Sequence, residues 1–288
     1  ASKYWPDSNP RQVDKLDVKL SRLETRFNLS RNEIIDRISA FAESRHAAGG
    51  QTLFLVNAGS SGSHWIEAML AEFNGIASLG EVYFSPKLRR HAKQLGPSGA
   101  GLFIHGVHLA HGNDLTDRAH SLLHINSAHI TNLSFYQNSL PDTKCILLCR
   151  DPYDIVVSRA FRKDEYRQYI ADDLDDDAYL DRNITYVKNF YRRNLKNDFD
   201  AVIHYEDFLD HPRKALRSLL QVMNVVGTDE QIDLAVGRHD RAAIASGKVK
   251  DSANYFKGTR QAVKSAHRTR ILEQLEPIRS ALGFQPMS

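Results

Sequence analysis

The chain has 288 residues, of which 42% are hydrophobic and 25% charged, and its formal net charge is +3. This composition is ordinary for a globular protein and supplies enough apolar residues for one large α/β domain without metal or disulfide staples. No apolar run approaches the roughly 18 residues that a membrane-spanning helix needs. The first residues also lack the apolar centre of a signal peptide, although the chain does not begin with Met. These features argue against a membrane-spanning protein.

The two cysteines indicate a reducing compartment. Cys145 and Cys149 lie in an apolar run that is typical of a strand. Four residues of strand span about 13 Å, whereas a disulfide needs Cα atoms within roughly 7 Å, so the two cannot pair. Buried thiols favour the cytoplasm. Glycosylation-like triplets at Asn28, Asn132 and Asn183 point the other way, but such triplets often arise by chance.

Apolar residues at helical spacing over residues 13–47 predict two helices, divided near Asn28 and Ser30. Ser30 and Glu33 have the spacing of a capping box, which is typical of a helix start. We expect residues 1–48 to form a helical extension to a main domain of residues 49–288. This extension is a candidate for a lid or for a homodimer contact.

Short apolar runs alternate with helical patterns through the main domain. Strands are expected at 52–57, 102–105, 145–149 and 201–204, and helices at 63–73, 152–161, 179–195 and 213–223. Such alternation is typical of parallel sheets covered by helices. The predicted fold class is therefore α/β, a P-loop-like three-layer fold with a central, mainly parallel sheet and helices on both faces.

A Gly/Ser-rich loop, Gly59-Ser60-Ser61-Gly62-Ser63, joins the first of these strands to the next helix. Glycines let backbone N–H groups approach phosphate oxygens, and the helix N-terminus adds positive partial charge. The loop lacks the Gly-x-x-x-x-Gly-Lys-Ser/Thr spacing of nucleotide-kinase loops. Phosphate binding and a plain turn of small residues both fit this loop when it is taken alone.

A second segment, Arg150-Asp151-Pro152, follows another expected strand. Asp151 suits a helix cap and Pro152 suits the first helical turn. Arg150 is therefore expected at the carboxyl end of a parallel strand, where open α/β sheets bind ligands. A guanidinium there can hold a phosphate through two hydrogen bonds. The alternative is a surface ion pair with Asp154.

These segments resemble the nucleotide-binding motifs of the PAPS-dependent sulfotransferases. Ser61-Gly62-Ser63-His64-Trp65 resembles their 5′-phosphosulfate loop, and Arg150 to Ser158 resembles their 3′-phosphate motif, Arg-x-Pro-x-Asp-x-x-x-Ser. Tyr205-Glu206-Asp207 resembles a segment whose Tyr lies near the adenine, and Lys257-Gly258 resembles the last part of the 3′-phosphate site. The four motifs occur in the family's order over residues 52–284.

The resemblance implies transfer of a sulfuryl group from PAPS to a hydroxyl of a small-molecule or carbohydrate acceptor, with PAP as the product. It implies no metal, and the sequence offers no aromatic-interleaved basic surface for nucleic acid. The nucleotide-binding residues that it implies are Ser60, Ser61, Gly62, Ser63, His64, Trp65, Arg150, Ser158, Tyr205, Lys257 and Gly258.

One position departs from the family pattern. Ser60 stands where the family usually has Lys, whose charge stabilises the leaving phosphate. His64 and Lys87 are candidates to replace it. The alternative function is a PAP- or PAPS-binding module with weak or lost catalysis, while the missing Lys argues against a phosphotransferase.

The acceptor hydroxyl also needs a general base. Glu81 is the first candidate, because it lies where carbohydrate-type and tyrosyl-protein sulfotransferases resemble this chain with a Gly-Glu pair. His108 and His105 are the alternatives, since cytosolic sulfotransferases carry Lys-Thr-His in the corresponding place.

Overall fold

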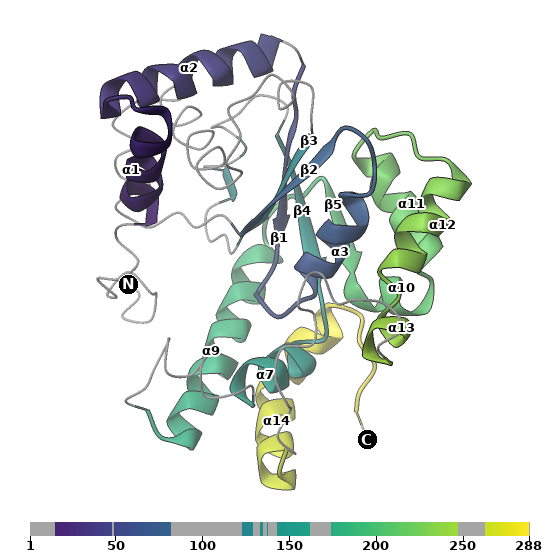
Figure 1. Cartoon of the computed structure of the whole chain (residues 1–288). Helices are drawn as coiled ribbons and strands as arrows, with labels where there is room; N and C mark the ends of the chain where they lie inside the picture. Colours follow the sequence, from purple (N-terminus) through teal and green to yellow (C-terminus); the bar gives the residue numbers. More distant parts are fainter. Residues whose placement is uncertain are drawn as a thin grey trace. The chain divides into compact units, whose positions relative to one another are not determined.

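The structure is a computed structural model that describes residues 15–47, 49–81, 123–128, 133–134, 137, 143–161, 174–246 and 263–287. Its helices are α1 (Lys15–Phe27), α2 (Arg31–Ala47), α3 (Ser63–Leu70), α7 (Pro152–Ala160), α9 (Asp176–Asn194), α10 (Tyr205–Asp210), α11 (Pro212–Val222), α12 (Asp229–Arg238), α13 (Arg241–Ala245) and α14 (Ser265–Ala281). Its strands are β1 (Thr52–Val56), β2 (Ile76–Glu81), β3 (Leu123–Ala128), β4 (Thr143–Cys149) and β5 (Ala201–His204) (Figure 1).

The strands form one sheet in the order β2-β3-β1-β4-β5. β2 pairs with β3 in parallel, with Ile76 opposite Leu123, and β4 pairs with β5 in parallel, with Cys149 opposite His204. Strands that are neighbours in space but not in sequence require crossover connections, which the intervening helices provide. The predicted fold class is confirmed as a parallel sheet flanked by helices.

The described chain falls into two compact units. The first contains α1, α2, β2 and β3, together with the first parts of β1 and β4. The second begins at Leu55 and Ile146 in those two strands and contains α3, α7, β5 and all the later helices. The predicted boundary between residues 48 and 49 stays a prediction.

In the first unit, α1 and α2 pack against each other as a helical hairpin. Their buried side chains are Leu23, Ile34, Ile38 and Phe41. Asn28 adopts a left-handed conformation with φ of 51°, which ends α1. The backbone N–H of Ser30 donates to the Glu33 carboxylate at 2.7 Å, and the N–H of Glu33 donates to Ser30 Oγ at 3.4 Å. The predicted break and capping box are thus confirmed.

In the second unit, the helices form two packed groups. One consists of α7, α9 and α14, and the other links α3, α12, α11 and α10 in turn. The end of β4, from Ile146 to Cys149, is wholly buried, as expected for a parallel strand with a neighbour on each side. Cys145 and Cys149 are buried and form no disulfide, as predicted. Burial, with a contribution from nearby Glu206, raises the pKa of the Cys149 thiol to about 12.

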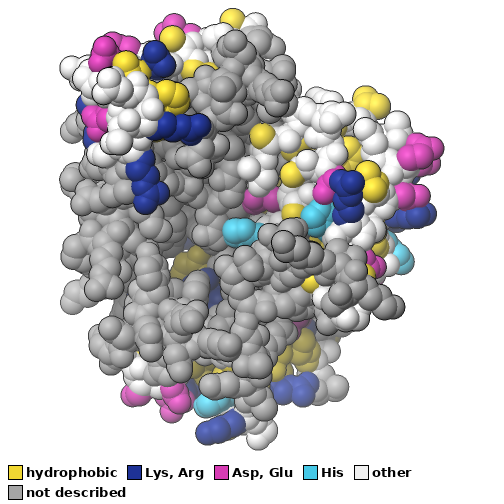
Figure 2. Space-filling view, in the orientation of Figure 1, with side chains coloured by type: hydrophobic (Ala, Val, Ile, Leu, Met, Phe, Trp, Pro, Cys, Tyr) yellow, Lys and Arg dark blue, Asp and Glu magenta, His cyan; other side chains and the backbone are white. Residues whose placement is uncertain are grey.

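The outer surface of α11 and α12 carries interspersed charges of both signs, visible at the right of Figure 2. Arg213 pairs with Asp233 at 2.8 Å, and Arg217 pairs with Asp229. All four side chains are largely exposed, so these ion pairs contribute little to stability. Among the described helices, none is both long and apolar enough to cross a membrane.

Candidate functional site

The register of β4 and β5 brings two predicted site residues together. Cys149 lies opposite His204, so the residues that follow, Arg150 and Tyr205, leave the sheet side by side at its carboxyl edge. Arg150 Cζ lies 4.5 Å from the centroid of the Tyr205 ring. A guanidinium at this distance over an aromatic face makes a favourable cation–π contact. The predicted position of Arg150 at a strand end is confirmed.

The loop after β1 reaches the same place. Arg150 Nη1 donates to the backbone carbonyl of Ser60 at 2.8 Å. Asn57 shapes the start of the loop, because its side-chain oxygen accepts from the Gly59 N–H at 2.9 Å and its amide donates to the Leu55 carbonyl at 2.9 Å. Gly59 and Ser60 are both left-handed, with φ of 73° and 56°. The chain therefore turns sharply before α3.

Gly62 places the N-terminus of α3 against Tyr205. It is the N-cap residue of that helix, with φ of 87° and no side-chain cap. A Cβ built on Gly62 would overlap the edge of the Tyr205 ring, so any larger residue would push the loop and ring apart. The first turn of α3 contains no acidic residue. An uncapped helix N-terminus of this kind suits an anion.

Trp65 connects the first turn of α3 to His239 and to Tyr205. Its indole N–H donates to the His239 carbonyl at 2.7 Å, and its ring meets Tyr205 edge-on with centroids 5.8 Å apart. Ser61 and Ser63 are buried, whereas His64 is exposed. Tyr205 itself is only 3% exposed, so it acts first as a support for Arg150 and Gly62. Its predicted contact with adenine stays a prediction.

The Arg150 side chain is 9% exposed, and the described residues satisfy only part of its hydrogen-bonding capacity. Its Nη2 lies 3.8 Å from the Asp154 carboxylate, and its Nε has no hydrogen-bond partner among the described residues. Burial lowers the pKa of Arg150, and the nearby carboxylates of Asp154 and Glu206 oppose that shift. The ion pair considered as the alternative exists, but it is long and Asp154 is 44% exposed. A buried guanidinium therefore keeps donors for an anionic ligand.

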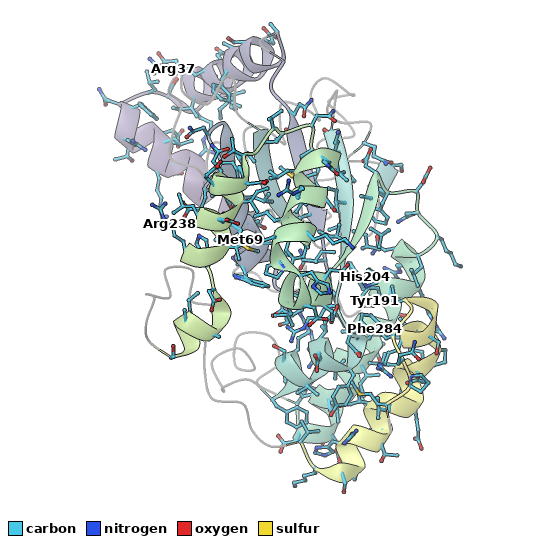
Figure 3. The ribbon with its side chains drawn as sticks, turned by 90° about the vertical axis from the view of Figure 1, so that its right-hand side faces the viewer. Arg37, Met69, Tyr191, His204, Arg238 and Phe284 are labelled. Carbon is cyan, nitrogen blue, oxygen red and sulfur yellow. The ribbon has the colours of Figure 1, made fainter. Side chains whose placement is uncertain are left out.

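Tyr191, from α9, holds the backbone of Arg150 in place. Its hydroxyl accepts from the Arg150 N–H at 3.1 Å and donates to the Arg150 carbonyl at 3.0 Å. Tyr191 is fully buried, and burial raises its pKa well above the ordinary value, so the phenol stays neutral and can serve both groups. Figure 3 shows Tyr191 among the side chains of the second unit.

Asp151 begins α7 and ties it to α14. Its carboxylate accepts from the Tyr153 N–H at 2.9 Å, which confirms the predicted cap. Arg279 donates to the same carboxylate from Nε and Nη2, at 2.9 to 3.1 Å. The Asp151 N–H donates to Glu206 Oε1 at 2.9 Å. Burial raises the pKa of Glu206, whose other oxygen has no partner among the described residues.

Ser158 is buried on α7, but it exchanges no described hydrogen bond with Arg150 or the loop. Glu81 is the last residue of β2, in the first unit, beside a shift in register with β3. The other predicted site residues, Lys87, His105, His108, Lys257 and Gly258, lie outside the described residues. The strand expected at 102–105 also falls there.

Sequence reasoning missed Tyr191, Glu206 and Arg279 as supports of the site. The sequence has eleven tyrosines, and no motif surrounds Tyr191 to distinguish it from the others. Arg279 lies 128 residues from its partner Asp151. Glu206 differs from these two residues because the sequence offered a signal for it. It stands in the Tyr-Glu-Asp segment beside the predicted site residue Tyr205, and acids in a functional site often have perturbed pKa values.

Known proteins resemble this chain in sequence and in fold. Residues 51–271 match the family described as the Sulfotransferase domain. The structure resembles sulfotransferase STF9 from Mycobacterium avium with a TM-score of 0.55 and 11% identity, over 99% of this chain and 88% of that one. It resembles mouse sulfotransferase SULT7A1, solved with PAP, with a TM-score of 0.50 and 13% identity, over 80% and 85% of the two chains.

No curated protein matches the sequence with significance. The family match nevertheless spans most of the chain, from just before β1 into α14, and includes each described residue from the loop to Tyr205. The chain therefore belongs to the sulfotransferase domain family.

Proposed function

We propose that this protein transfers a sulfuryl group from PAPS to a hydroxyl of a small-molecule or carbohydrate acceptor and releases PAP. The family supports sulfuryl transfer, and mouse SULT7A1 was solved in complex with PAP. The two buried thiols of this chain, Cys145 and Cys149, favour a reducing, cytoplasmic setting.

One observation carries the nucleotide part of the proposal. Among the described residues, the buried guanidinium of Arg150 has no hydrogen-bond partner for its Nε and forms an ion pair with Asp154 that is 3.8 Å long. It lies against the loop that leads into the uncapped N-terminus of α3. Leaving a buried cation under-satisfied is costly unless an anion completes its hydrogen bonds. A nucleotide with a phosphate at each end fits this pair of anion sites, with the 3′-phosphate on Arg150 and the 5′ end at the loop.

The residues have distinct roles in the proposed reaction. Arg150 and Ser158 bind the 3′-phosphate, and residues 61–65 bind the 5′ end, where α3 adds positive partial charge. The acceptor oxygen attacks sulfur, the bond from sulfur to the 5′-phosphate oxygen breaks, and that electron pair leaves with PAP. Glu81 takes the acceptor proton, with His108 and His105 as the alternatives.

Ligand-induced thermal shift tests this proposal. PAP and PAPS should raise the melting temperature, whereas ATP should not. At a hundred times its Kd, a bound ligand adds about 2.7 kcal/mol to the free energy of unfolding. Arg150→Gln should weaken PAP binding by roughly 10- to 100-fold, because it removes a charge-assisted hydrogen bond. The same change should leave the affinity for adenosine 5′-phosphate, which lacks the 3′-phosphate, almost unchanged.

Arg192→Gln is the matched control, because Arg192 is an exposed arginine on α9. It should bind PAP like the unchanged protein. Absence of any stabilisation by PAP would refute the proposal. If PAP binds but no PAP is released from PAPS in the presence of phenols, alcohols and monosaccharides, the binding-module alternative motivated by Ser60 is favoured instead.

A further inference from the structure

Glu206 is a partly buried acid in the first turn of α10, and its carboxyl group reaches the start of α7. Its Oε1 accepts from the Asp151 N–H at 2.9 Å. Its Oε2 is buried as well and has no hydrogen-bond partner among the described residues. A buried carboxylate oxygen without a donor is costly, so the protonated form is favoured, and burial raises the pKa of Glu206.

Arg150 is the cation that acts on this carboxyl group. Its charge lowers the pKa of Glu206, and Glu206 in turn raises the pKa of Arg150. The hydrogen bond of Arg150 goes instead to the Ser60 carbonyl, and its ion pair is with Asp154 at 3.8 Å. The attraction between Arg150 and Glu206 therefore acts through space, and an anion that binds to the guanidinium would cancel it.

Titratable groups on the other elements around Glu206 do not share this behaviour. On β4, burial raises the pKa of the Cys149 thiol to about 12, and on α9, burial raises the pKa of Tyr191 well above its ordinary value. Both groups are therefore neutral near pH 7. The charge of Asp151 is matched by Arg279 of α14, which donates to its carboxylate from two nitrogens.

α10 also packs against β5 and α11. The titratable groups of these two elements, and the remaining ones of α10 and its end, are His204, Asp207, Asp210, His211, Arg213, Lys214 and Arg217. All except His204 are exposed, so water and salt screen them. His204 contacts Phe284 edge-on, and its contribution is the same with or without the Glu206 carboxylate.

A phosphate at Arg150 would leave this cluster with excess negative charge. Before binding, the single positive charge of Arg150 faces two carboxylates, those of Asp154 and Glu206, which both raise its pKa. A phosphate monoester adds about 1.5 to 2 negative charges at pH 7. Protonation of Glu206 at Oε2 would remove one negative charge and leave the hydrogen bond at Oε1 intact.

We propose that Glu206 takes up a proton from solution, at Oε2, when the 3′-phosphate of the nucleotide binds beside Arg150. Glu206 then opposes nucleotide binding at high pH and does not oppose it at low pH. The inference rests on the proposed sulfuryl transfer, in which Arg150 holds the 3′-phosphate. The proton returns to solution when PAP dissociates, so product release is coupled to ionisation of Glu206.

The direction of the pH dependence follows from the two states of the protein. The pKa of Glu206 in the free protein already lies above its ordinary value of 4.5, and the bound phosphate raises it further. Below both pKa values the carboxyl group is neutral with or without nucleotide, so it does not weaken binding. Between the two values the affinity falls as the pH rises, and above both the loss is complete.

Glu206→Gln tests this coupling, because Gln is neutral, has nearly the same shape and keeps an oxygen for the Asp151 N–H. At pH 8 the variant should bind PAP about tenfold more tightly than the unchanged protein, the effect of one unit of coupling in pKa. At pH 5 the two affinities should agree within about twofold. Calorimetric titration in two buffers of different ionisation enthalpy measures the protons taken up, and at intermediate pH the unchanged protein should take up more than the variant.

Two controls isolate the proposed pair of groups. Asp210→Asn removes a carboxylate from an exposed position on the same helix, and it should leave PAP affinity unchanged at both pH values. Adenosine 5′-phosphate lacks the 3′-phosphate, so it should bind to the unchanged protein and to Glu206→Gln with the same affinity at pH 8.

Weaker PAP binding by Glu206→Gln at both pH values would show that Glu206 only supports the start of α7, and it would overturn the inference. Equal proton uptake by the two proteins would overturn it too, even though PAP binds as proposed. If PAP does not bind to the unchanged protein at all, the proposed sulfuryl transfer fails and this inference fails with it. If Glu206→Gln does not fold, infrared difference spectra of the unchanged protein decide: the C=O band of a protonated carboxyl group should grow when PAP binds, and its absence would refute the proposal.

Discussion

At the scale of single residues, Gly62 is a loop position with no room for a side chain. Its φ is 87°, and a Cβ added to it would stand 2.3 Å from Cε2 of the Tyr205 ring. The same ring supports the Arg150 guanidinium. A side chain at Gly62 would therefore disturb the loop and, through Tyr205, the arginine that the proposed nucleotide requires.

Replacing Gly62 by Ala should lower stability by about 2 to 4 kcal/mol, because left-handed strain of about 1 to 2 kcal/mol adds to the overlap with the ring. PAP affinity should fall with it. Gly75→Ala is the matched control, since Gly75 has the same φ of 87° but nothing within 4 Å of the added Cβ. Denaturant unfolding of both variants measures the difference, and equal losses would show that the ring contact is unimportant.

At the scale of elements, a buried ion pair between Arg279 and Asp151 joins α14 to α7 beside the site. Arg279 and Asp151 have side chains only 2% and 9% exposed, and Arg279 also donates to the Gln285 carbonyl at 2.9 Å. Just beyond α14, Phe284 packs edge-on against His204, the last residue of β5 (Figure 3). The C-terminal segment thus supports the residues next to Arg150 and Tyr205.

Arg279→Gln should destabilise the protein by about 3 to 5 kcal/mol, because it leaves the buried Asp151 carboxylate without its charged partner. Arg217→Gln is the control. It breaks an ion pair with Asp229 whose side chains are 50% and 70% exposed, and the loss should stay below about 1 kcal/mol. Urea unfolding compares the two, and a small effect of Arg279→Gln would mean that water replaces the guanidinium at this join.

Local pattern was enough to predict the elements that carry strong signals. The Asn28 break, the β4 run and the Asp151-Pro152 helix start each follow from a few adjacent residues. β2 and β3 were missed, because β2 contains Gly80 and a shift in register, and β3 mixes His124 and Asn126 with its apolar residues. Such strands are specified by their neighbours in the sheet rather than by their own propensity.

The sequence was enough to predict the type of site and two of its segments, but not the contacts between them. Spacing and resemblance led to Arg150 and the loop, because both lie next to a strand. The contact of Arg150 with Tyr205 depends on how β4 and β5 align, and that alignment is a tertiary property.

At the scale of the whole molecule, the candidate nucleotide site and the first candidate for the general base belong to different units. Every described residue of the candidate nucleotide site, from Ser60 to Tyr205, is in the second unit, whereas Glu81 is in the first. Substitutions in the two units should therefore separate nucleotide affinity from turnover.

Glu81→Gln should keep PAP affinity unchanged and lower PAP release from PAPS by roughly 100- to 10,000-fold, the usual contribution of a general base. Glu43→Gln, at an exposed acid on α2 in the same unit, should change neither quantity. Calorimetric titration with PAP and a PAP-release assay measure the two effects. Near-normal turnover in Glu81→Gln would move the assignment to His108 or His105.

Because β4 is buried, the cysteines on this strand can report how often it separates from its neighbours in the sheet. The only two cysteines of the chain, Cys145 and Cys149, both lie on this strand with no exposed surface. A thiol reagent in solution can reach them only when β4 leaves its neighbours, so the labelling rate under native conditions measures how often the strand opens. A nucleotide that binds at the end of β4 would slow that labelling, without any engineered probe or any knowledge of the acceptor.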